Sequence, residues 1–137
     1  MITNSAHLRA GVELKKLTGA QLLGPAAERE QMSCDRYLGD GEAVVPGLIS
    51  YALDGSKTPG ELALVLEETT FISGDLVRAH RADSLMLLGP DKLRDRAAAV
   101  ASLRRVLKLH PRIETILMGD GWSLFRDGAA RLGSLLG

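Results

Sequence analysis

Three charged residues in glycine-containing segments are the first candidates for chemistry. Lys57 precedes "TPG" in "GSKTPGE", Asp75 follows glycine in "FISGDLV", and Asp120 lies between glycines in "MGDG". Both aspartates follow apolar runs typical of strands, so they could bring two carboxylates together at strand ends. An unpaired pair of carboxylates raises one of the two pKa values, and a cation such as Lys57 would compensate their charge. Either aspartate could instead be a simple turn residue.

Four further residues could line a ligand-binding site beside that cluster. Arg78 and His80 follow the segment of Asp75, either in the same cleft or on an exposed loop. His7 lies near an expected helix start, where a histidine often caps the helix or faces solvent. Trp122, beside "GDG", could wall a pocket or anchor the last helix to the sheet. Each of these candidate ligand-binding residues therefore has a structural alternative.

Length and charge limit the classes of protein to which the chain can belong. A chain of 137 residues has the length of one domain, so we expect a single domain over residues 1–137. Lys and Arg together number 17, as do Asp and Glu, so no net field favours nucleic acid or an anionic membrane. No apolar run near about 18 residues and no basic-then-apolar N-terminus occurs, which predicts neither a membrane span nor a signal peptide. The single cysteine, Cys34, can form no internal disulfide, which fits a cytoplasmic protein.

The N-terminal segment is expected to hold one amphipathic helix between two short strands. "MIT" would be the end of a strand, and Ser5 would cap a helix over residues 5–17. Its buried side would carry Leu8, Val12, Leu14 and Leu17. A short strand should then end at Pro25, followed by a short helix, "AAEREQM", whose charges face water.

The middle of the chain has the pattern of antiparallel strands. From Tyr37 onward, glycines separate the apolar runs "EAVVPG" and "LISYALDG". The next run, "ELALVLEETTFISGDLV", predicts a hairpin of residues 62–66 and 71–74. Leucine-rich runs of this length leave some ambiguity with helix.

Two longer helices are expected toward the C-terminus. Pro90 would open the first, with Asp91 and Asp95 in its early turns, where carboxylates suit the helix dipole. Its buried face would carry Leu93, Ala97, Val100, Leu103 and Leu107. A strand in "RIETILMG" follows, and Ser123 would cap a last helix to about residue 136. Because each helix has one apolar face, both should cover a sheet. We therefore expect an α/β (α+β) fold with a mixed β-sheet flanked by helices.

The order of these segments resembles the second half of the metallo-β-lactamase fold hydrolases. The resemblance rests on "SKTPGELALVLEETTFISGDLV", a long helix, and a strand ending "MGDG". Upstream, "TNSAHLRAGVELKKLTGAQLLGPAAERE" is similar to the family's segment from the HxHxDH motif to a "TGA" turn. The resemblance implies a partial αββα sandwich, truncated at its N-terminus, because the sheet that precedes the HxHxDH strand has no counterpart.

The resemblance also implies that most metal ligands of the family are replaced. His7 falls on the last histidine of HxHxDH, preceded by Ala6 where an aspartate is usual, although a gapless register would lose all four ligands. Lys57 replaces the histidine before "TPG", and Asp120 replaces that of "GHG". Asp75 alone keeps the residue type that the family has at its metal-ligand position. Zinc needs three or four nitrogen, sulfur or carboxylate ligands, and a protonated lysine provides none.

We therefore expect a catalytically degenerate protein with a metal-free charge cluster of Lys57, Asp75 and Asp120, a binding or structural role, and no cofactor. One alternative is a hydrolase with one residual zinc site at His7, Asp75 and Asp120, or with an acid–base pair of Lys57 and a carboxylate. A second alternative is an interaction or assembly subunit.

The continuous apolar run "ELALVL" indicates a strand buried on both faces. The expected helices suffice for one face, so the other would associate with a partner. We expect a homo-oligomer, most simply a symmetric dimer, with a small molecule as a further possible ligand. Neither nucleic acid nor a membrane is expected as a partner.

Overall fold

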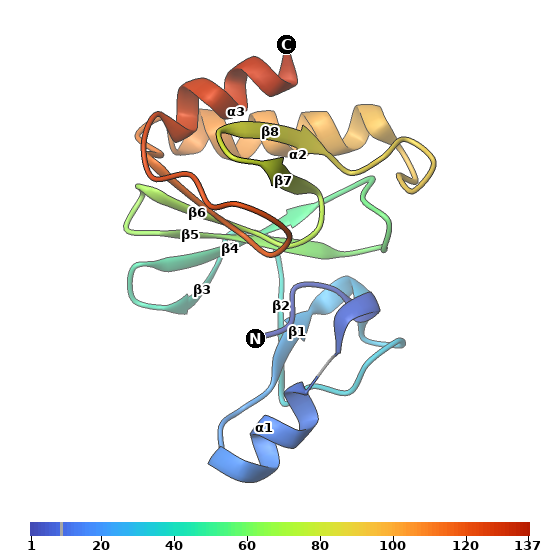
Figure 1. The fold of residues 1–137 in the computed structure, drawn as a ribbon. Helices are drawn as coiled ribbons and strands as arrows, with labels where there is room; N and C mark the ends of the chain where they lie inside the picture. Colours follow the sequence, from blue (N-terminus) through green and yellow to red (C-terminus); the bar gives the residue numbers. More distant parts are fainter. Residues whose placement is uncertain (9) are drawn as a thin grey trace.

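A five-stranded mixed sheet forms the centre of the structure, in the strand order β3-β4-β5-β6-β9 (Figure 1). The computed structural model describes residues 1–8 and 10–137. The strands are β3 (Glu42–Val45), β4 (Leu48–Leu53), β5 (Glu61–Leu66), β6 (Thr70–Ser73) and β9 (Thr115–Met118). Neighbouring strands are antiparallel except β6 and β9, which are parallel. The carboxyl ends of β6 and β9 therefore meet at one edge, and Asp75 and Asp120 each follow one of them.

One face of the sheet is covered by helices α2 (Arg96–Leu109) and α3 (Gly128–Leu136) together with a hairpin of β7 (Val77–Arg81) and β8 (Ser84–Leu87) (Figure 1). The main core lies in this layer. Its fully buried side chains include Leu53, Val65, Phe71, Leu103, Val106, Ile116 and Leu132. The predicted fold class, a mixed sheet flanked by helices, is confirmed.

The N-terminal segment lies on the other side of the sheet in the view of Figure 1. It contains η1 (Ser5–His7), α1 (Gly11–Thr18), η2 (Ala26–Glu28) and a parallel pair of short strands, β1 (Leu23–Pro25) and β2 (Arg36–Leu38). Its own small core consists of Ile2, Leu22 and Met32, packed against Cys34. The backbone of Leu62 in β5 donates a hydrogen bond of 2.8 Å to Thr3, which fixes this segment to the sheet.

The strands in the middle of the chain were predicted correctly, including the hairpin of β5 and β6. The predicted strand at "MIT" is not formed, although Ile2 donates a backbone hydrogen bond of 2.8 Å to Leu23. The hairpin of β7 and β8 was not predicted, because its sequence, "VRAHRADSLML", is short and mixes charged with apolar residues.

The predicted helix over residues 5–17 is wrong in its bounds and its burial. A 3-10 turn, η1, is followed by α1, and Asn4 rather than Ser5 caps η1 through a hydrogen bond of 3.1 Å from the Ala6 amide. Residue 9 of the predicted helix lies outside the described residues. The side chains expected to be buried are exposed: Leu8 by 37%, Val12 by 50%, Leu14 by 56% and Leu17 by 76%. Helix α1 has no buried residue, so the predicted buried face is absent from it.

The two C-terminal helices begin later than predicted. Asp95, not Pro90, is the N-cap residue of α2, and its carboxylate accepts a hydrogen bond of 3.0 Å from Ala98, whereas Asp91 precedes the helix. The buried face is also rotated from the prediction and consists of Ala99, Ser102, Leu103 and Val106. Helix α3 begins at Gly128, and the Ser123 hydroxyl accepts a hydrogen bond from Met118 instead of capping the helix.

In the described ranges, 1–8 and 10–137, no helix combines the length and the hydrophobicity that a membrane span requires.

Candidate functional site

Lys57, Asp75 and His7 meet between the N-terminal segment and the edge of the sheet. The Nζ atom of Lys57 lies 2.7 Å from Oδ2 of Asp75, and Nε2 of His7 lies 2.8 Å from the same oxygen. The Lys57 Nζ and His7 Nε2 atoms are 3.0 Å apart. Lys57 comes from the loop between β4 and β5, Asp75 from the turn after β6, and His7 from η1. Three separate segments therefore contribute to what we call the Lys57 cluster.

The Asp75 carboxylate is the centre of the Lys57 cluster. Its side chain is buried, and Asn4 donates a further hydrogen bond of 3.1 Å from Nδ2 to Oδ2. Burial alone would raise the pKa of Asp75, but the Lys57 ammonium and the Asn4 amide outweigh it, so the pKa is lowered. Asp75 is therefore an anion at neutral pH, and Lys57 supplies a compensating positive charge.

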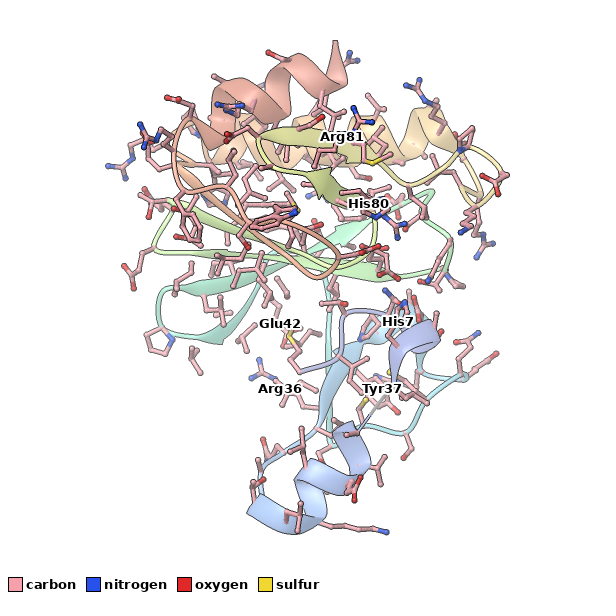
Figure 2. All side chains as sticks on the ribbon, in the orientation of Figure 1. His7, Arg36, Tyr37, Glu42, His80 and Arg81 are labelled. Atoms are coloured by element: carbon pink, nitrogen blue, oxygen red, sulfur yellow. The ribbon has the colours of Figure 1, made fainter. Side chains whose placement is uncertain are left out.

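Asp120 lies outside this cluster, contrary to the prediction from the sequence. Its Oδ2 atom lies 3.2 Å from Nη1 of Arg78 and 3.3 Å from Nε2 of His80. These partners come from β7, which forms a bridge at Ala79 to Gly121 and so runs beside the loop that contains Asp120. Figure 2 shows His80 on the hairpin of β7 and β8, apart from His7 in the N-terminal segment. Asp120 thus pairs with the Arg78 guanidinium and contacts the His80 imidazole, and no ion pair joins it to Lys57.

A pocket of about 420 Å³ opens beside the cluster, between α1 and the carboxyl ends of β6 and β9. His7 and Asp75 line it together with the apolar side chains of Ile2, Leu8 and Leu14. Of the other candidate ligand-binding residues, Arg78, His80 and Trp122 do not line this pocket. Trp122 is 64% exposed, so it neither walls this pocket nor anchors α3 by burial.

Two buried glutamates next to the cluster were missed by sequence reasoning. Glu61, the first residue of β5, accepts hydrogen bonds from the Asp75 and Leu76 amides at 2.7 and 2.8 Å, and burial raises its pKa. A usable signal was present, because Glu61 alternates with Ala63 and Val65 and so points to the same buried face. Glu28 is also fully buried, so the expectation that the charges of "AAEREQM" face water is wrong for this residue. No pattern in its short segment indicated this.

The whole sequence, residues 1–137, matches a family described as the metallo-beta-lactamase superfamily. The chain belongs to that superfamily, which confirms the resemblance found in its motifs. No curated protein matches the sequence.

Solved structures of metallo-β-lactamases share the fold. The DIM-1 metallo-β-lactamase aligns with a TM-score of 0.74 and 15% identity, over 98% of this chain and 66% of its own. A metallo-β-lactamase from Pontibacter korlensis gives 0.65 and 18%, over 92% and 62% of the two chains. FIM-1 from Pseudomonas aeruginosa, in its mono-zinc form, gives 0.69 and 18%, over 92% and 59%. The chain therefore spans less than two thirds of the length of these structures.

The fold family implies zinc, but the side chains at the Lys57 cluster do not fit a zinc ion. His7 and Asp75 could each provide a ligand, and a protonated lysine amine within 3.0 Å of both cannot. Asp120, the third ligand that the residual-site alternative requires, is paired with Arg78 and His80. Across residues 1–8 and 10–137, no group of three or more His, Cys, Asp or Glu side chains has a geometry that could hold a metal ion.

Proposed function

We propose that this chain is a non-hydrolytic member of the superfamily, with a binding or structural role built around the Lys57 cluster. The observation that carries the proposal is the Lys57 ammonium, which lies 2.7 Å from Asp75 and 3.0 Å from His7. Its positive charge takes over the electrostatic part of a metal's role, because it compensates a buried carboxylate. An ammonium provides neither a vacant coordination position nor a bound water, so the nucleophile that a zinc site supplies is missing.

A small molecule is the simplest partner for a binding role. The pocket beside the cluster combines apolar walls with the His7 imidazole and the Asp75 carboxylate, as ligand sites commonly do. Because Lys57 compensates the charge of Asp75, this ion pair adds little net charge to the pocket. This composition favours an uncharged, mostly apolar ligand.

A hydrolysis assay tests the non-hydrolytic proposal. The purified chain would be incubated with a chromogenic β-lactam, the substrate class in the name of the structurally similar enzymes, with and without added zinc. We expect the β-lactam to be hydrolysed no faster than in buffer without protein, and at the same rate with the unaltered chain as with Asp75→Asn. Zinc-dependent turnover that Asp75→Asn abolishes would contradict the proposal and favour a residual zinc site.

A second candidate function, assembly with another copy of the chain, is favoured by the exposed face of α1. Leu14 and Leu17, three positions apart on the same side of α1, are 56% and 76% exposed. Contiguous exposed apolar side chains of this kind mark interaction surfaces in soluble proteins. A symmetric dimer would bury the same patch on both copies. Sedimentation velocity tests this candidate, and we expect a dimer whose fraction rises with concentration. A protein that stays monomeric at roughly tens of micromolar, on the order of the dissociation constant of a weak interface, would contradict it.

A further inference from the structure

We propose that Glu28 and Glu61 are positioning residues that hold Lys57, His7 and Asp75 in contact. This inference rests on the proposed role of the Lys57 cluster and adds the two residues that set its geometry. Both glutamates are fully buried, and no described cation forms an ion pair with either. Burying a carboxylate is costly unless hydrogen bonds satisfy it, so the partners of these two residues explain their presence.

Glu61 joins the loop that carries Lys57 to the turn that carries Asp75. One carboxylate oxygen, Oε1, accepts the amides of Asp75 and Leu76 at 2.7 and 2.8 Å. The other oxygen accepts the hydroxyl of Ser56, the residue before Lys57, at 2.5 Å. A single side chain therefore fixes the backbone on both sides of the ion pair.

Glu28 joins the same loop to the segment that carries His7. Its Oε1 atom accepts the Gly60 amide at 2.9 Å, and its Oε2 atom accepts the Ser5 amide at 2.5 Å. Ser5 begins the turn that ends with His7. Burial opposes ionisation of Glu28, but the hydrogen-bond donors of Ser5, Thr58 and Gly60 outweigh it, so its pKa is lowered. Glu28 and Glu61 together thus connect all three segments of the cluster.

The two sites differ in what a glutamine could replace. At Glu28 both oxygens accept backbone N–H groups. In a glutamine one of these oxygens becomes an NH₂ donor, which would point at a backbone N–H donor and could not bond to it. At Glu61 one partner is a hydroxyl, which can accept from an amide, so Glu61→Gln can keep all the contacts of Glu61. Glu61→Met keeps a similar volume but removes both acceptors. Exposed Glu30 provides a matched control, Glu30→Gln.

The test is the energetic coupling between Lys57 and Asp75, measured in each of these backgrounds. Unfolding constants would be determined in denaturant for Lys57→Met, Asp75→Asn, the double variant and their parent. Lys57→Met raises the unfolding constant by some factor. In the unaltered background we expect this factor to be about tenfold larger with Asp75 present than with Asp75→Asn, and the ratio of the two factors measures the coupling. Glu28→Gln and Glu61→Met should reduce this ratio toward one, whereas Glu61→Gln and Glu30→Gln should leave it unchanged. A glutamate that only stabilised the fold would lower all four stabilities alike and leave the ratio intact.

The outcomes separate this inference from the proposed function. Coupling that persists in Glu28→Gln and Glu61→Met would overturn the positioning role and leave the Lys57 cluster standing. A ratio near one in the unaltered chain would overturn both, because there would be no coupled pair to position.

If a variant does not fold, hydrogen exchange in the unaltered chain tests the same contacts. The amides of Gly60, Asp75 and Leu76 should exchange only through global unfolding, because buried carboxylates hold them. Exchange of these three amides as fast as that of exposed loops would overturn the inference.

Discussion

The ammonium of Lys57 and the carboxylate of Asp75 form an ion pair of 2.7 Å across the edge of the central sheet. The side chain of Lys57 is 24% exposed and that of Asp75 only 9%, so the carboxylate is the more costly group to leave without an ion-pair partner. The pair joins the loop before β5 to the turn after β6. Its two members should therefore depend on each other for stability.

Lys57→Met should destabilise the fold by about 2 kcal/mol, because it leaves the Asp75 charge largely buried without its cation. Adding Asp75→Asn should recover part of that loss, since the double variant contains no unpaired buried charge. Equilibrium denaturation of both variants measures the difference. Equal losses in the single and double variants would show that the two groups are not coupled.

The stability of the fold should decrease in acid because Asp75 becomes protonated. Its pKa is lowered in the folded chain, mainly because Lys57 and Asn4 outweigh the effect of burial, so the folded state binds fewer protons than the unfolded state. The stabilisation is therefore complete above the unfolded pKa of about 3.9 and is lost as the pH falls through the folded value. In urea titrations, Asp75→Asn should flatten the loss of stability below about pH 4. Parallel profiles for the two proteins would contradict this assignment.

Asp120 should contribute far less than Asp75. Its carboxylate is 44% exposed, so water reaches the acceptor of both interactions, although the partner Arg78 is only 15% exposed. We expect Asp120→Asn to cost about 0.5 kcal/mol or less, the range of exposed ion pairs. A loss of stability as large as that of Lys57→Met, measured by the same denaturation, would show that Asp120 belongs to the Lys57 cluster.

Local apolar patterns predicted the strands, and the motif order of the resembling family predicted the Lys57–Asp75 contact. The position of Asp120 could not be predicted in this way. It depends on the β7–β8 hairpin, which brings Arg78 and His80 beside a loop 40 residues later in the chain. The burial of Glu28 depends likewise on contacts with Ser5 and Gly60, which are distant in sequence.

The exposed face of α1 shows a different limit of sequence patterns. Apolar spacing predicted a buried face for this segment, but all four of its apolar side chains are exposed. A periodic pattern predicts burial only where another element packs on the face, and Leu14 and Leu17 remain 56% and 76% exposed among the described residues.

Leu17→Ser should weaken self-association and leave the fold intact. Its side chain is 76% exposed, so the stability change should stay within about 0.5 kcal/mol. Leu109→Ser, at a 56% exposed position on α2, provides the control and should not change association. Sedimentation velocity at several concentrations would show both effects, and equal behaviour of the two variants would exclude α1 as the contact surface.

Zinc binding tests the replacement of the metal by Lys57 most directly. The chain would be purified without chelator, dialysed against micromolar zinc at neutral pH, and analysed for metal per chain beside Asp75→Asn. We expect far less than one zinc per chain in both proteins, because Lys57 already compensates Asp75. One tightly held zinc per unaltered chain, lost in Asp75→Asn, would contradict the account.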